Sequence, residues 1–333
     1  MRPLAAVAEE KQRSMDRNMK HRAGAGTGAE QAAAGTANMS AAQNKAALGR
    51  IAASMAIFGT VGIFIKKLPF PSAVIALGRG IIGSIFLLLT AVLTKKTMDI
   101  PAVKKNFKLL ILSGIAIGVN WILLFESYKY IPVSTATLCY YLSPVFVTLA
   151  SPVVLKEKLT VTKVACVGAA LLGMVLISGV FRENSGANNQ FTGILFACGA
   201  AVLYAAVVLI NKFIKDIPAN DCTVMQLGTV AVVLLPYVLL TENPGSIEWQ
   251  PSYLAMLVFV GIVHTGIAYK LYFSAVQYVE GQTIALLSYI DPVVTIILSA
   301  IVLGEPLTVY SISGAVLILG STMAGELFGK NNM

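Results

Sequence analysis

Two stretches of the sequence, YYLSPVFVTLASPVVLKEKLT over residues 140–160 and SYIDPVVTIILSAIVLGEPLT over residues 288–308, decide the fold because they are copies of one another. Shifting the sequence on itself by 148 positions places residues 118–161 over residues 266–309 without a gap. Proline, tyrosine and glutamate match as well as apolar residues, so a shared apolar character does not explain the likeness. The matched pairs include Tyr141 and Tyr289, Pro144 and Pro292, and Glu157 and Glu305. The sequence therefore predicts a duplicated chain.

The composition indicates the solvent in which this duplicated chain folds. Of the 333 residues, 56% are hydrophobic and only 12% are charged, and the mean hydropathy is +0.76. Soluble domains average about 45–50% apolar and about 25% charged residues. A water-facing surface with so few charges would leave large apolar patches exposed. The composition argues against a soluble globular enzyme and favours an integral membrane protein.

Outward from the repeat, the apolar residues fall into segments of membrane length. A helix needs about 20 apolar residues to cross the roughly 30 Å hydrocarbon core of a bilayer. Ten such segments are predicted, at residues 47–66, 72–94, 107–127, 132–153, 160–181, 190–212, 223–241, 252–277, 280–303 and 307–328. We therefore expect an all-α integral membrane protein with ten transmembrane helices and no extramembrane domain.

The ten spans divide into two repeats of five, at residues 47–181 and 190–328, behind a polar tail at residues 1–46 that is expected to be disordered. Because five is an odd number, the second repeat inserts upside down relative to the first. Inverted repeats are typical of secondary transporters, in which a site near the midplane is reached alternately from the two sides. Channels and some membrane enzymes also contain duplicated bundles.

Lysine and arginine residues predict the orientation, since cytoplasmic loops carry the excess of both. If the amino terminus lies inside, the outward loops hold only Lys66, Lys67, Lys129 and Arg182. The inward loops then hold Lys95, Lys96, Lys104, Lys105, Lys108, Lys156, Lys158, Lys163, Lys212 and Lys215. We expect both termini in the cytoplasm. The net charge of +9 is then mainly an insertion signal, and no nucleic-acid partner is expected because no basic binding motif is present.

Several motifs resemble the EamA branch of the drug/metabolite transporter superfamily. They are ALGRGIIG around Arg79, YLSP at residues 141–144 with LKEKLT at residues 155–160, and ALLSYIDP at residues 285–292 with LGEPLT at residues 303–308. The resemblance covers nearly the whole chain after the tail. It implies a plasma-membrane carrier, often an exporter of amino acids or related metabolites, with a central cavity between the halves. It also implies that spans five and ten occupy a dimer-like packing position, which allows a homodimer.

Ionisable residues inside a membrane are costly and usually face an interior or a partner. Asp291 and His264 are predicted at similar depth and are candidates for binding substrate or protons. Lys270 occupies a position where the resemblance leads us to expect an uncharged residue. Three alternatives remain open for Lys270: its side chain extends to the membrane surface, pairs with Asp291, or binds a substrate carboxylate.

Arg79 and Glu126 are predicted at similar depth in spans two and three, so an ion pair that joins these helices is the leading hypothesis. Contact with the substrate or a gate is the second. Pro144 and Pro292 interrupt the hydrogen bonding of spans four and nine and are candidates for a hinge or a cavity wall. Further polar or aromatic cavity candidates are Asn120, Trp121, Tyr140, Tyr141, Gln226, Tyr269, Ser288 and Tyr289.

The sequence contains no nucleotide-binding loop, HExxH motif or nucleophile elbow, so neither ATP-driven transport nor hydrolysis is expected. The four cysteines match neither a metal site nor a disulfide framework, and no metal or cofactor is predicted. The sequence favours a secondary transporter that exports a small metabolite, such as an amino acid or a related compound, by alternating access around a central midplane cavity. The alternative is a membrane-embedded enzyme or a lipid-handling protein with a duplicated helical bundle.

Overall fold

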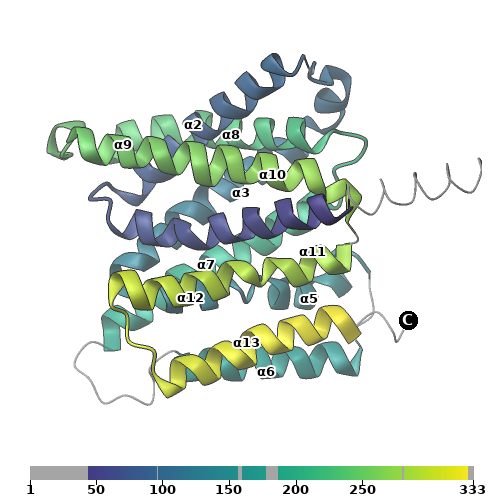
Figure 1. Ribbon diagram of the computed structural model, residues 1–333, viewed down its shortest axis with the longest axis vertical. Coiled ribbons are helices and arrows are strands. Elements are labelled where there is room, and N and C mark those ends of the chain that lie inside the picture. Colours follow the sequence, from purple (N-terminus) through teal and green to yellow (C-terminus); the bar gives the residue numbers. More distant parts are fainter. Residues whose placement is uncertain (1–43, 96, 157–159, 178–186, 280, 329–333) are drawn as a thin grey trace, which may run out of the picture. The chain divides into compact units, whose positions relative to one another are not determined.

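The computed structural model describes residues 44–95, 97–156, 160–177, 187–279 and 281–328. Almost all of the predicted tail, and Glu157 of the repeat, therefore lie outside the described residues. The chain forms two compact units, Met1–Gly49 and Arg50–Met333, and the helix packing described below is that of the second unit. Figure 1 shows the helices of this unit in sequence colours.

The described residues are helical nearly throughout. The first helix spans Asn44–Lys66. It is followed by α2 (Ser72–Leu93), α3 (Ile100–Tyr130), α4 (Val133–Tyr140), α5 (Ser143–Val154), α6 (Val161–Ile177), α7 (Ala187–Asn211), α8 (Ala219–Thr241), η1 (Pro244–Ser246), α9 (Pro251–Phe259), η2 (Val260–Ile267), α10 (Ala268–Ala275), η3 (Val276–Tyr278), α11 (Gly281–Ser288), α12 (Ile290–Leu303) and α13 (Val309–Phe328).

These elements form the ten predicted membrane spans. Eight spans are long and apolar enough to cross a bilayer, and two shorter apolar helices, Val161–Ile177 and Val309–Gly325, complete the set in the described part of the chain. Large apolar side chains on the outer faces of the helices remain exposed, such as Val161, Leu240 and Val153. The prediction of an all-helical membrane protein with ten spans is confirmed.

Local sequence explains where the helices begin. The Asp99 side chain caps α3 by accepting a hydrogen bond from the Ala102 N–H at 3.0 Å, and Pro101 lies in the first turn, where its missing N–H is not needed. This cap starts α3 at Ile100, well before the predicted residue 107. In α2, α4 and α8 a proline immediately precedes the first helical residue.

Three of the ten spans are interrupted near their middles. Span four breaks between α4 and α5, with Pro144 in the first turn of α5, and span nine breaks at Tyr289, just before Pro292 in α12. Span eight passes through η2, which is a π-helix, between α9 and α10. The proline positions were predicted and the π-helix was not. Such π-helical turns are frequently found at functional sites.

Helix α2 packs closely against the π-helix because glycines remove the side chains between them. A Cβ atom added at Gly83 would overlap the side chain of Thr265, and one at Gly266 would lie 2.5 Å from the Phe86 ring. Helices α3 and α7 pack side by side, as do α6 and α13, which form a pair in Figure 1. Close packing of α2 therefore fixes the position of the π-helix and of its side chains.

Successive spans run in opposite directions, so the unit has two ends. We call the end that contains Lys66, Tyr130, Val133 and Glu305 the Glu305 end, and the opposite end the Lys105 end. At the Lys105 end, Lys105 pairs with Asp216 at 2.8 Å, and both side chains are largely exposed. The hydrogen bond from Lys105 lowers the pKa of the Asp216 carboxyl below its ordinary value near 3.8.

Candidate functional site

Arg79 on α2 is a buried charge within the helices. Only 4% of its surface is exposed. The guanidinium carbon lies 4.2 Å from the centre of the Trp121 ring and 5.3 Å from that of Phe125, while Nε donates a hydrogen bond to the Thr265 hydroxyl at 3.1 Å. Within the described residues no carboxylate lies within 4.0 Å of the guanidinium. Aromatic faces and one hydroxyl thus orient a cation that has no carboxylate partner there.

Tyrosine hydroxyls surround this cation. Tyr140 of α4 and Tyr269 of α10 both lie within electrostatic range of the Arg79 guanidinium. The Tyr140 ring packs against Tyr204 of α7 at 5.3 Å between ring centres, and its hydroxyl hydrogen-bonds with Asn120. Asn120 also donates to the Ala200 carbonyl at 2.5 Å, so it holds α3 against α7. Helices from both repeats therefore supply these aromatic groups.

Asp291 lies near the same tyrosines. It interacts electrostatically with Tyr140, Tyr141 and Tyr204. Thr295, one turn later on α12, donates to the Gly59 carbonyl at 2.8 Å and to the Asp291 carbonyl at 3.1 Å. This bonding holds the start of α12 against the first helix.

The interruptions of spans four and nine meet at this site. The Tyr141 hydroxyl donates to the Ser288 carbonyl at 3.0 Å, and the Tyr141 and Tyr289 rings lie 6.4 Å apart. Ser288 precedes Pro292 by four residues, so its carbonyl has lost its usual helical donor. The phenol of one repeat thus bonds the carbonyl whose usual helical donor the proline of the other repeat removes.

We call this set of side chains the central cluster. Its members are Arg79, Trp121, Tyr140, Tyr141, Tyr204, Tyr269 and Asp291. It combines a cation on aromatic faces, several phenol groups and a carboxylate that is not ion-paired with the cation. A small molecule with an anionic group and a second polar group has suitable partners here.

Two other predicted residues make their hydrogen bonds outside this cluster, although His264 lies within electrostatic range of Arg79. His264 is 1% exposed in the π-helix, where its Nε2 lies 2.8 Å from the Thr60 hydroxyl and its ring packs against Phe64 and Phe259. Gln226 donates to Ser113 at 2.7 Å and to Asn211 at 2.9 Å, which ties α8 to α3 and α7. These contacts join helices to one another.

Lys270 neighbours Tyr269 in sequence but is exposed. Among the described residues no ion pair joins it to Asp291, so that alternative is not realised in this structure. The exposed position agrees with a side chain that extends toward the membrane surface.

The hypothesis of an ion pair between Arg79 and Glu126 is wrong for this structure. Glu126 instead accepts a hydrogen bond from Ser72 at 2.7 Å and pairs with Lys129 at 2.7 Å. Ser72 begins α2, and Arg79 lies seven residues further along, or about 10 Å along the helix axis. The two charges were predicted at one depth, but Glu126 bonds near the Glu305 end while the Arg79 guanidinium turns inward over Trp121.

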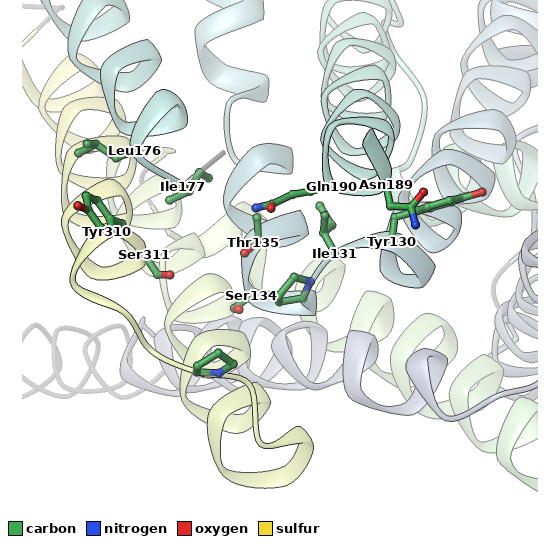
Figure 2. A pocket seen from close by; sticks show the side chains of 12 residues that line it. Tyr130, Ile131, Ser134, Thr135, Leu176, Ile177, Asn189, Gln190, Tyr310 and Ser311 are labelled. Carbon is green, nitrogen blue, oxygen red and sulfur yellow. The ribbon is translucent and has the colours of Figure 1, made fainter. Parts of the chain in front are cut away.

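A pocket of about 310 Å³ lies at the Glu305 end, away from the central cluster. Figure 2 shows side chains from α4, α6, α7 and α13 around it. The lining residues are Tyr130, Ile131, Pro132, Ser134, Thr135, Leu176, Ile177, Asn189, Gln190, Pro306, Tyr310 and Ser311. Hydroxyl and amide groups predominate among its polar side chains, and none of these residues is charged.

Sequence reasoning missed two contributors to the cluster, and it missed the pocket. Tyr204 is a lone tyrosine within an apolar run of α7; it is 41% exposed, its ring packs against Tyr140, and its position within an apolar run could have indicated a role in the cluster. Thr265 follows His264, but no pattern predicts that it orients Arg79, because the contact depends on the π-helix. In the described part of the chain, no group of three or more His, Cys, Asp or Glu side chains could hold a metal ion.

Ten apolar helices around a cluster of polar and aromatic side chains define a multi-pass integral membrane protein. The model of the EamA-like transporter family matches residues 46–179 and 191–324, and the chain belongs to this family. The family membership confirms the resemblance found in the sequence and identifies a transporter, not an enzyme.

Relatives of known sequence and structure agree with this assignment. The chain is 28% identical over 281 residues to the uncharacterized transporter YxxF of Bacillus subtilis (strain 168), covering 84% of this chain and 89% of that protein. It is 25% identical over 217 residues to the biotin transporter of Escherichia coli (strain K12), covering 64% and 71% respectively. A crystal structure with 18% identity superposes with a TM-score of 0.61 over 86% of this chain and 99% of the other, which shows a common fold.

Proposed function

We propose that this transporter is a secondary carrier that exports a small metabolite, an amino acid or a related compound, by alternating access around the central cluster. The observation that carries this proposal is the buried Arg79, which lies over Trp121 without a carboxylate partner in the described residues. A substrate carboxylate would supply the missing negative charge, and Asp291 offers a partner for an ammonium group.

Lysine and arginine counts support the orientation that goes with this function. We propose a protein of the plasma membrane with both termini in the cytoplasm, so that the Glu305 end faces outward. The segments 47–181 and 190–328 then act as two inverted repeats, with Pro144 and Pro292 at the hinges of spans four and nine. The apolar outer faces of α6 and α13 are proposed to join two copies in a homodimer.

Flux measurements on proteoliposomes test the carrier. Protein reconstituted into sealed vesicles should exchange radiolabelled amino acids in a saturable, counterflow-competent manner. Arg79→Met should weaken carboxylate binding by about 10- to 100-fold, the range expected when hydrogen bonds to a charged group are lost. Arg79→Lys should fall in between because it keeps the charge and loses the planar fork.

Lys270→Met is the matched control, since it removes an exposed cation from the same membrane region. It should transport normally. If Lys270→Met abolished flux while Arg79→Met preserved it, the cation of the binding site would be Lys270. Chemical conversion of the compounds without flux would contradict a carrier altogether.

A second candidate substrate class is a carboxylate whose remaining part is uncharged. The biotin transporter of E. coli, to which the chain is similar, is named for such a compound. This class would need Arg79 but not the Asp291 carboxylate. Asp291→Asn therefore separates the two: it should impair transport of amino acids and leave transport of biotin unchanged.

A further inference from the structure

The Glu305 carboxylate joins the two repeats at one end of the molecule. Its Oε1 accepts a hydrogen bond from the Val133 N–H at 2.6 Å, and its Oε2 accepts from the Ser134 N–H at 3.1 Å and from the Ser134 hydroxyl at 2.8 Å. Glu305 lies in the connection between α12 and α13, whereas Val133 and Ser134 begin α4. We call these three hydrogen bonds the Glu305 clamp.

The clamp is electrostatically favourable. The first N–H groups of a helix have no partner within the helix, and the N-terminus carries partial positive charge, so a carboxylate bound there is stabilised. Lys66 also lies within electrostatic range of Glu305, and its ammonium group donates to the Tyr128 carbonyl. The clamp thus holds α4 beside the end of the first helix.

The pocket of Figure 2 lies directly against this clamp. Ser134, which bonds to Glu305, and Pro306, which follows Glu305 in the chain, both line the pocket. Helix α4 also continues from the pocket to the central cluster, because Tyr141 follows Thr135 by six residues, or about 9 Å along the helix axis.

Packed side chains close the interval between the pocket and the cluster. Leu138 is 2% exposed, and Cys139 is fully buried. A movement that opens this interval by displacing the start of α4 breaks the hydrogen bonds to Glu305.

We propose that the pocket is the outer vestibule through which the substrate leaves or reaches the central cluster, and that the Glu305 clamp keeps α4 closed between the two. The outward direction rests on the proposed function. Uncharged hydroxyl and amide groups line the vestibule, and they would bind a polar metabolite weakly enough to release it. Glu305 acts as a positioning residue because it touches α4 and not the central cluster.

The native thiol of Cys139 reports on the clamp. In a variant with Cys166, Cys198 and Cys222 replaced by serine, Cys139 should react slowly with a membrane-impermeant methanethiosulfonate reagent added outside intact cells. Glu305→Gln places an amide NH₂ group against backbone N–H donors and should raise the labelling rate about tenfold or more, as expected for lost charge-assisted hydrogen bonds. Ser134→Ala removes one bond and should raise the rate less.

Two controls make the result decisive. Glu242→Gln neutralises a carboxylate at the same end of the molecule, in the residue that follows α8, and no hydrogen bond joins it to α4 among the described residues, so it should leave Cys139 protected. Asn189→Cys places a thiol in the vestibule wall and should react from outside whether or not Glu305 is present. If Cys139 were as well protected in folded Glu305→Gln and Ser134→Ala as in the parent protein, the clamp would be overturned. If Asn189→Cys were labelled only from the cytoplasmic side, the vestibule would be overturned.

Labelling does not require a substrate. If Glu305→Gln exposes Cys139 but proteoliposomes show no flux of any amino acid, the clamp stands and the proposed function fails. If flux is normal but Glu305→Gln leaves the labelling of Cys139 unchanged, the proposed function stands and the clamp fails.

Discussion

Single backbone and side-chain groups explain why the central cluster forms where the spans are interrupted. Pro292 lacks the N–H group that would have bonded the Ser288 carbonyl. A backbone carbonyl without a hydrogen-bond donor costs on the order of several kcal/mol inside a membrane. Tyr141 supplies the replacement donor at 3.0 Å. The cost of the interruption is therefore offset by a contact between the two repeats.

Tyr141→Phe tests this contact at the residue scale. The variant loses the hydrogen bond to the Ser288 carbonyl and the electrostatic contact between the phenol oxygen and Asp291, while its ring is retained. We expect a fall in stability of about 1–3 kcal/mol, because buried partners are left unsatisfied, together with slower transport. Thermal unfolding in detergent and counterflow measure the two effects.

Tyr278→Phe is the matched control for this change, since it also removes a phenol hydroxyl. Tyr278 lies after α10, where span eight ends, and its side chain is 53% exposed. It should unfold and transport like the parent protein. Wild-type stability and transport in Tyr141→Phe would mean that the Ser288 carbonyl is satisfied in another way.

At this scale the sequence predicted positions better than partners. The repeat identified Tyr141 and Pro292, and burial cost identified Arg79 and Asp291, all of which lie at the site. The partners of these side chains were harder to predict, because the depth of a residue along a helix does not tell to which side of the helix axis its side chain points. Arg79 and Glu126 were paired because of their similar predicted depth. In the structure the Arg79 guanidinium packs over the Trp121 ring, while Glu126 accepts a hydrogen bond from Ser72 and pairs with Lys129.

At the scale of elements, the π-helix is the main departure from the expected regular span. It presents Thr265 to Arg79 and His264 to Thr60 from consecutive positions, so one segment contacts both α2 and the first helix. Nothing in composition or hydrophobic period signals an i→i+5 turn, so this element could not be predicted. The ten spans could be, because twenty apolar residues in succession have few other stable arrangements in a bilayer.

Gly83→Ala tests the packing of α2 on this π-helix. A methyl group at Gly83 would overlap Thr265, and the displacement should weaken the bond from Arg79. We expect a loss of about 1–3 kcal/mol, typical of overpacking, and reduced affinity for carboxylate substrates. Chemical or thermal unfolding measures the loss of stability, and the KM of transport measures the loss of affinity.

Gly168→Ala in α6 provides the comparison, since no atom lies within 4 Å of the added methyl group. Replacing glycine in an open helix position should leave stability unchanged or raise it by up to about 1 kcal/mol. If the two variants behaved alike, close approach would not be what fixes the π-helix.

For the whole molecule, the duplication read from residues 118–161 and 266–309 was the most informative feature of the sequence. It predicted two related halves, and the structure joins the halves at two levels, through Tyr141 and Ser288 at the span interruptions and through Glu305 and Ser134 at one end. The clamp could not be derived from the repeat, since matching two glutamates says nothing about what either one bonds. The pocket likewise depends on the ends of five helices, α3, α4, α6, α7 and α13, that sequence alone does not bring together.

The last prediction concerns the orientation of the protein in the membrane, with the Lys105 end in the cytoplasm and the Glu305 end outside. The direction of transport depends on this orientation. Loops at the Lys105 end carry most of the lysines, and each lysine near a span opposes transfer across the membrane. A fluorescent protein fused after residue 333 should therefore fold and fluoresce in the cytoplasm, while a periplasmic or extracellular phosphatase reporter at that position should be inactive. The same phosphatase inserted at Ser246, between α8 and α9, should be active. A reversed pattern would place the Glu305 end in the cytoplasm, and the vestibule would then serve uptake of substrate from the cell interior instead of its release outside.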